Sequence, residues 1–136
     1  MKNYQYLDHT ADLGIEVYGQ TLEALFMNIG IAIFETQLSG EITEEEQFNI
    51  TLSEESLEEL FVDWCRELLY NFSVHGFIPK TYIISIENFT LNAQMHGDRL
   101  DLKHHSIKTE IKNVTYHDLK IGKVNDHYQA TVIFDV

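Results

Sequence analysis

The segment EESLEELFVDWCRELLYNFSVHG, residues 54–76, decides the fold because it carries the most regular apolar pattern in the chain. Its apolar residues recur every three or four positions, which places them on one helical face: Leu57, Leu60, Phe61, Trp64, Cys65, Leu68 and Phe72. Acidic residues fill the first turn, where the helix dipole favours negative charge, and Gly76 supplies a stop. The pattern therefore predicts a helix that Ser53 caps and Gly76 ends.

A second helix is predicted upstream, in TLEALFMNIGIAIFETQL, residues 21–38. Its apolar residues also recur at three and four, with Thr21 as the N-cap and Ser39-Gly40 as the stop. Gly30 inside it weakens the helix by only about 1 kcal/mol. The two predicted helices are the only segments of the chain with this period.

The remaining apolar segments alternate with period two and predict strands. They cover residues 13–19, 46–52, 81–89, 90–97, 107–121 and 127–136, with turns at His96-Gly97-Asp98 and near Gly122. Helices and strands in this order predict an α+β fold in which two helices pack on one mainly antiparallel β-sheet. At 136 residues, the chain fits a single domain, residues 1–136.

The charge of the chain limits its partners. Nine Lys and Arg against 22 Asp and Glu give a formal charge of -13, which repels a phosphate backbone, so we expect no tight direct binding to nucleic acid. No apolar run approaches the roughly 20 residues that cross a bilayer, so we expect no membrane association. A single cysteine and no signal-like start predict a cytoplasmic protein.

The histidine and cysteine residues predict neither a zinc site nor a nucleophile. The chain has seven histidines but no HxxxH or HExxH, so a dedicated zinc site is not expected. His104 and His105 are adjacent and would face opposite ways on a strand. Cys65 has helical neighbours that are apolar, which is typical of a small buried residue and not of a nucleophile.

Two acidic features lie at opposite ends of the chain. DHTAD, residues 8–12, places two carboxylates beside a predicted strand, either as turn caps or as ligands of a hard cation. At the other end, Asp135 is followed by Val136, and the side-chain carboxylate there lies close to the α-carboxylate. Two such anions repel unless a cation or a donor lies between them, so a cation is the simpler explanation.

The chain resembles the archease family in four blocks that occur in one order: DHTADLGIEVYG with TLEALF, LEELFVDWCRELLYNF, EIKNVTYHDLKI and YQATVIFDV. The resemblance implies a two-layer archease-like domain and a metal-binding accessory protein. Such a protein activates the RNA-splicing (tRNA) ligase, promoting its guanylylation and multiple turnover in tRNA splicing and RNA repair. The implied partner is that ligase, and no enzymatic activity is implied for the chain itself.

The resemblance also implies a metal site at Asp12, Asp135 and Val136, the last through main-chain oxygen. The expected cofactor is a divalent cation, with calcium preferred to magnesium or manganese. Asp8 is then assigned to local structure, and His9 lies near the ligands as a possible partner contact. Lys112, an isolated cation in an acidic chain, is either a contact for an acidic or phosphate group of the partner or a solvated strand lysine. His117 belongs to the resemblance, but no chemistry is assigned to it.

Two alternative functions stay open. The first is a small metal-dependent phosphoester hydrolase, in which Asp12 and Asp135 hold a cation that activates water. Against it, the sequence supplies no convincing general base and no second carboxylate cluster. The second is a chaperone-like binding module in which the cation is structural.

Overall fold

The computed structural model describes residues 3–8 and 12–136. The helices are α1 (Leu22–Gln37) and α2 (Leu57–His75). The strands are β1 (Tyr4–Leu7), β2 (Leu13–Gly19), β3 (Leu38–Ser39), β4 (Glu46–Ser53), β5 (Phe77–Glu87), β6 (Thr90–Arg99), β7 (Ser106–Ile107), β8 (Asn113–Val124) and β9 (His127–Asp135).

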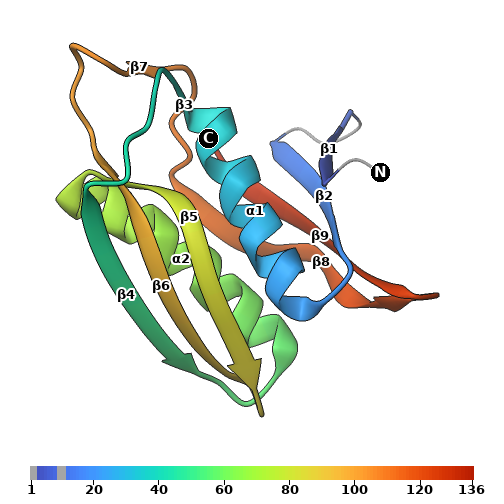
Figure 1. Cartoon of the computed structure of the whole chain (residues 1–136). Coiled ribbons are helices and arrows are strands. Elements are labelled where there is room, and N and C mark those ends of the chain that lie inside the picture. Colours follow the sequence, from blue (N-terminus) through green and yellow to red (C-terminus); the bar gives the residue numbers. More distant parts are fainter. Residues whose placement is uncertain (1–2, 9–11) are drawn as a thin grey trace.

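The strands form antiparallel sheets that sit on either side of the helices (Figure 1). The order is β1-β2-β9-β8 in the four-stranded sheet and β4-β6-β5 in the three-stranded sheet, and β3 pairs with β7 in a short ribbon. The α+β class with two helices and mainly antiparallel strands is thus confirmed, but the strands divide among separate sheets and do not form one. The reason is that each helix contacts strands of both larger sheets: α1 packs on β2 and β5, and α2 packs on β8 and β4.

The helix boundaries follow from local side-chain chemistry. Thr21 caps α1 as predicted, because its Oγ1 accepts a hydrogen bond from the Ala24 N–H at 3.0 Å. For α2 the predicted cap was wrong: Ser56, not Ser53, accepts from the Glu59 N–H, at 3.1 Å. Ser53 ends β4, where its hydroxyl bonds to that of Thr90 at 2.8 Å.

Gly76 ends α2 in the left-handed conformation, with φ of 69°, as predicted. The predicted turn at His96-Gly97-Asp98, by contrast, is wrong, and the turn predicted near Gly122 lies three residues further along the chain. Residues 96–98 continue β6, where Gly97 lies against β5 so closely that a Cβ would be 2.0 Å from the Ile78 carbonyl oxygen. Gly122 lies within β8, and the turn follows at Asn125, with φ of 58°.

One hydrophobic cluster fills the space between the helices and the sheets. Trp64 of α2 is fully buried at its centre, and its indole N–H donates to the Phe26 carbonyl oxygen of α1 at 2.8 Å. Phe26 and Phe61 meet edge to face across the same helix pair. No helix in the described ranges is long and apolar enough to cross a bilayer.

Candidate metal centre and partner surface

The two acidic ends of the chain meet on neighbouring strands. β2 pairs antiparallel with β9, and Leu13 lies opposite Phe134. Asp12 directly precedes Leu13 and Asp135 directly follows Phe134, so the two aspartates lie at the same end of this strand pair. The C-terminus lies beside the last turn of α1, at the same end of the molecule (Figure 1).

An open hollow of about 520 Å³ lies at this end of the strands. It is lined by residues from five separate parts of the chain: Tyr6, Asp12, Leu13, Thr36, Lys108, Thr109 and Val136. Asp135 is not among the lining residues. The structure therefore brings Asp12 and Val136 to one hollow, whereas Asp135, which precedes Val136, is not part of its lining.

The lining of the hollow is rich in oxygen. Besides Asp12 and Val136, it includes three hydroxyl side chains that were not predicted from the sequence: Tyr6, Thr36 and Thr109. Calcium and magnesium take carboxylate, hydroxyl, carbonyl and water oxygens, so the donor set fits a hard cation. The described residues contain no group of three or more His, Cys, Asp and Glu side chains placed to hold a metal, so such a site would depend on main-chain, hydroxyl or terminal oxygens as well.

One positive charge already lines the hollow. Lys108 lines it together with Asp12 and Val136, and an ammonium group at this position would compete with a bound cation for these oxygens. The alternating pattern predicted Lys108 within a strand and not at the site. It lies instead between β7 and β8, outside any strand.

The end of α1 holds that segment in place. The Gln37 carbonyl oxygen accepts from the Lys108 N–H at 2.8 Å, and its Oε1 accepts from the Ile111 N–H at 3.2 Å. Gln37 is 1% exposed, so these bonds are shielded from water. At the preceding residue, the hydroxyls of Thr36 and Tyr6 bond at 2.8 Å and link α1 to β1.

β1 is fixed on α1 by a second tyrosine. The Tyr4 hydroxyl donates to the Glu35 carboxylate at 2.7 Å. Burial, followed by this hydrogen bond, raises the pKa of Tyr4 well above its ordinary value, so the phenol stays protonated and keeps donating. Since β1 carries Tyr6, these contacts position one wall of the hollow.

Lys112 joins the candidate metal site to a second surface. Its backbone N–H donates to the Asp135 carbonyl oxygen at 2.8 Å, which fixes Lys112 next to the end of β9. Its side chain lines a groove of about 600 Å³ between α2 and the 107–113 segment. Arg66 and Tyr70 of α2 form the facing wall. Within the described ranges, no acidic side chain lies within ion-pair distance of the Lys112 ammonium group, which is consistent with the predicted contact for an anionic group.

The other predicted residues have different outcomes. His9 lies outside the described residues. Cys65 is fully buried, as predicted, and burial raises the pKa of its thiol far above the ordinary value. His117 is exposed and pairs with Asp118 at 3.3 Å, where the register of β8 on β9 shifts.

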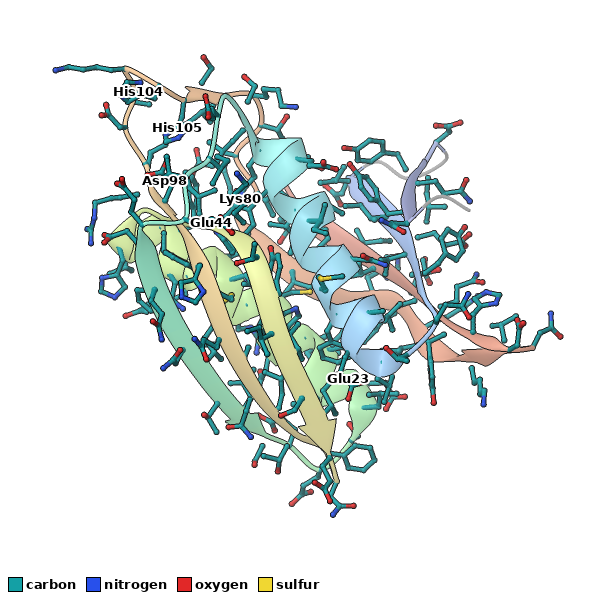
Figure 2. The ribbon with its side chains drawn as sticks, viewed as in Figure 1. Glu23, Glu44, Lys80, Asp98, His104 and His105 are labelled. Carbon is teal, nitrogen blue, oxygen red and sulfur yellow. The ribbon has the colours of Figure 1, made fainter. Side chains whose placement is uncertain are left out.

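His105 is buried in a way that the sequence did not indicate. Its Nδ1 accepts from the Asp101 N–H at 3.0 Å, and its Nε2 lies 3.0 Å from the Glu41 carbonyl oxygen and 3.2 Å from Asp98 Oδ2. Figure 2 shows His105 close to Asp98, with His104 farther out at the edge of the molecule. Both ring nitrogens are occupied, so the ring connects three segments and has no free nitrogen to serve as a general base.

Asp98 completes this cluster. Burial alone would raise the pKa of its carboxyl, but hydrogen bonds from the N–H groups of Thr43 and Arg99, with the nearby His105, hold that pKa below its ordinary value. The cluster therefore stabilises the loop before β4 against the end of β6 with an ionised carboxylate.

Comparison with known proteins gives one family. The model of the Archease protein family (MTH1598/TM1083) matches residues 4–136. Protein archease of Methanosarcina barkeri is 39% identical over 145 residues, covering 99% of this chain and 97% of that protein. Protein archease of Pyrococcus abyssi is 32% identical, and the match covers 100% of both chains.

Two solved structures share the fold. The solution structure of Methanobacterium thermoautotrophicum Protein 1598 has a TM-score of 0.78 at 29% identity, with 100% of both chains covered. The crystal structure of a Thermotoga maritima protein, described as an archease and possible chaperone, has a TM-score of 0.70 at 26% identity. It covers 96% of this chain and 94% of that chain. Both candidate metal strands and the Lys112 segment therefore lie inside the matched region.

Proposed function

This chain belongs to the archease family, and we propose that it is a cytoplasmic, metal-binding accessory protein that activates an RNA-splicing (tRNA) ligase. In this proposal the ligase carries out all nucleotide and RNA chemistry. The chain promotes guanylylation of the ligase, and so its repeated turnover in tRNA splicing and RNA repair. It has no catalytic residue of its own.

The single observation that carries the proposal is the meeting of the two chain ends. Asp12 and Asp135 are 123 positions apart in sequence, and the pairing of Leu13 with Phe134 beside them supports a shared site at this end of β2 and β9. Two carboxylates at adjacent strand ends repel, and a divalent cation removes that repulsion. We assign Asp12, Asp135 and the main-chain oxygen of Val136 as its ligands, with calcium as the preferred ion. The cation would supply a fixed positive charge at this end of the molecule.

The partner surface would extend from this cation along the Lys112 groove. A chain of formal charge -13 is attracted to a basic protein, so a ligase with a basic nucleotide-binding cleft is an electrostatically matched partner. Lys112 would contact an acidic or phosphate group of that complex. His9, close to Asp12 in sequence, is assigned to the same contact region.

A guanylylation assay tests the proposal. Catalytic amounts of the wild-type chain should speed guanylylation of the ligase from the same cell, and Asp12→Ala and Asp135→Ala should each abolish the effect. Asp126→Ala, in the exposed turn between β8 and β9, is the matched control and should activate as the wild type does. Unchanged activation by both Asp12→Ala and Asp135→Ala would contradict the assigned site.

Calorimetric titration with calcium tests the ligands directly. Asp12→Asn should weaken binding, while Lys108→Met should strengthen it, because the competing ammonium group is removed from the hollow. A protein that ends at Val136 can also be compared with one that carries a C-terminal tag, which converts the Val136 carboxylate to an amide. Equal affinity would assign the carbonyl oxygen, and weaker binding by the tagged protein would assign the charged carboxylate.

A chaperone-like binding module is the second candidate, because the Thermotoga maritima relative is described as a possible chaperone. In that case the cation is structural. Calcium removal would then lower the melting temperature and leave ligase activation unchanged. Under the first proposal, removal of calcium abolishes activation at a temperature where the chain remains folded.

A further inference from the structure

β4 is an edge strand with an open side. The three-stranded sheet has the order β4-β6-β5, so β4 pairs on one side only, and no described segment pairs with the other (Figure 1). The strand is eight residues long, and its register on β6 runs from Glu46 to Ser53 without a bulge. A regular edge of this length presents a row of unpaired backbone donors and acceptors.

One hydrogen bond identifies the residues that form this row. The Glu54 N–H, directly after β4, donates to the carbonyl oxygen of Phe89, directly before β6, at 3.1 Å. The backbone polar groups of Glu54 therefore point toward β6. Backbone direction alternates along an antiparallel strand, so Leu52, Ile50 and Phe48 also point toward β6. The N–H and C=O groups that face outward therefore belong to the alternate set: Gln47, Asn49, Thr51 and Ser53.

The other sheet edges are protected and β4 is not. β5 carries Pro79 and Lys80 beside a register shift, and α1 packs against it. β1 has only four residues, and the register of β8 shifts between Thr115 and Lys120. Prolines, lysines, bulges and short lengths are the devices that prevent strand addition. Residues 47–53 of β4 contain none of them and no charge: Gln, Phe, Asn, Ile, Thr, Leu and Ser.

Charge lies instead at both ends of β4. Glu44 and Glu45 precede the strand and are exposed, and Glu54 and Glu55 follow it. Glu54 shares a hydrogen bond with Asp63, and this bond, with desolvation and the repulsion of nearby carboxylates, raises its pKa. Arg99 is the near cation at the first end, and it is already bound to Glu46 at 2.8 Å.

The acidic residues at both ends of β4 determine which kind of strand can pair with its open edge. If two copies paired antiparallel through β4 with Ile50 opposite Ile50, Glu54 and Glu55 of each copy would meet Glu45 and Glu46 of the other. Like charges directly opposed across strands are destabilising, so self-pairing is disfavoured. An added strand with an uncharged centre and basic residues at both ends meets opposite charge at each end.

We propose that the open edge of β4 binds an extended segment of a partner protein by β-strand addition, and that this segment has an uncharged, β-prone centre flanked by Lys or Arg. Main-chain bonds to Gln47, Asn49, Thr51 and Ser53 supply the affinity. Inward side chains of the added strand extend the apolar face of Phe48 and Leu52, both half-buried. This site is independent of the proposed ligase activation and lies away from the C-terminus in Figure 1.

Amide hydrogen exchange with a synthetic peptide tests the site. The probe has an alternating Thr/Val centre with two lysines at each end, and the protein is the full wild-type chain. On titration, the amides of Gln47, Asn49, Thr51 and Ser53 should gain protection, while those of Phe48, Ile50 and Leu52, already bonded to β6, should not change. No new protection of the first set would overturn the proposal.

Charge and backbone variants sharpen the test. The same peptide with glutamates in place of lysines should bind about tenfold more weakly. Asn49→Pro removes an outward N–H and leaves the hydrogen bonds between β4 and β6 in place, so it should weaken binding of the lysine peptide. Asn49→Ala keeps the N–H and should bind that peptide as the wild type does. A double variant, Glu54→Gln with Glu55→Gln, keeps the test decisive if the proline variant does not fold, because it should reduce the preference for lysine over glutamate ends.

Three results would count against the proposed partner. Equal binding of the lysine and glutamate peptides would contradict the preference for a segment with basic ends. Wild-type affinity of the Asn49→Pro variant for the lysine peptide would contradict binding by strand addition. Protection of the outward amides that grows with protein concentration, without peptide, would assign the edge to a second copy of this chain.

Discussion

The hydroxyl of Tyr82 is buried without a hydrogen-bond partner in the described structure, and its removal should stabilise the protein. The ring of Tyr82 projects from β5 against Trp64, edge on at 6.3 Å, and the hydroxyl lies at Gly30 of α1, where an added Cβ would be 2.8 Å away. Burial also raises the pKa of this phenol far above its ordinary value, so it stays neutral. A neutral hydroxyl that is buried and unpaired costs about 1–3 kcal/mol in protein mutational data.

Tyr82→Phe removes that cost and little else. The lost oxygen leaves a space of about 20 Å³, which costs about 0.5 kcal/mol at roughly 24 cal/mol per Å³. The net change is an increase of about 1 kcal/mol in the free energy of unfolding, or about 3–5 °C in Tm for a chain of this size. Urea unfolding followed by circular dichroism measures it, with an unchanged m-value showing that the unfolded state is the same.

Tyr4→Phe is the matched control, because the same atom is removed but the Tyr4 hydroxyl has a partner. Loss of its 2.7 Å bond to Glu35 should lower the free energy of unfolding by about 1 kcal/mol. The two substitutions should therefore shift the urea midpoint in opposite directions. A lower midpoint for Tyr82→Phe would refute the reasoning, since it would mean that the hydroxyl is satisfied.

Two further predictions concern the core and the loop before β4. Trp64→Phe loses the 2.8 Å bond to the Phe26 carbonyl oxygen and leaves a cavity, so it should lower the free energy of unfolding by about 2 kcal/mol, measured in urea. Asp98 has a lowered pKa in the folded chain, so its stabilising effect is full above its unfolded pKa of about 3.9 and is lost as pH falls through the lower folded value. Asp98→Asn should therefore be less stable than the wild type at pH 6, and the difference should shrink below about pH 4; a constant difference between pH 6 and pH 2.5 would contradict this.

The spacing of apolar residues predicted the helices and strands that bury one face and expose the other. The 54–76 segment became α2 because its apolar residues fall on one stripe, and Gly76 takes the left-handed conformation that ends it. The N-cap was misplaced by three residues, although Ser56 and Glu59 form the S-x-x-E pattern typical of a helix start. The sequence thus contains the signal for the correct cap, because the serine of that pattern is Ser56 and the apolar stripe begins directly after it.

Periodicity could not predict pairings between strands. Alternation shows that a segment is a half-buried strand, but not which sheet it joins, because both larger sheets bury one face on the same two helices. The predicted turn at residues 96–98 failed for a related reason. Glycine was interpreted as a turn signal, whereas Gly97 is needed because β5 approaches so closely that a side chain would strike the Ile78 carbonyl.

The candidate site was predictable only where charge and family resemblance agreed. Asp12, Asp135 and Val136 were identified from both, and the β2–β9 register is consistent with their proximity. Tyr6, Thr36, Lys108 and Thr109 were missed because an isolated hydroxyl or lysine in the sequence is ordinary. His105 was missed for the same reason, since its burial depends on Glu41, Asp98 and Asp101 meeting around it.

The distribution of charge connects the two proposed surfaces. Two of the chain's nine Lys and Arg residues, Arg66 and Lys112, line the groove beside the candidate metal site, and Lys108 lines the hollow. The ends of β4 are acidic. The electrostatic field of a chain with formal charge -13 would attract any basic partner at long range. The two surfaces differ only in the groups that a partner meets at contact distance. At the hollow, a partner meets cations and oxygen ligands, whereas at β4 it meets backbone groups between carboxylates. One partner could therefore bind both surfaces only if it presented an anionic group to the first and a basic-ended strand to the second.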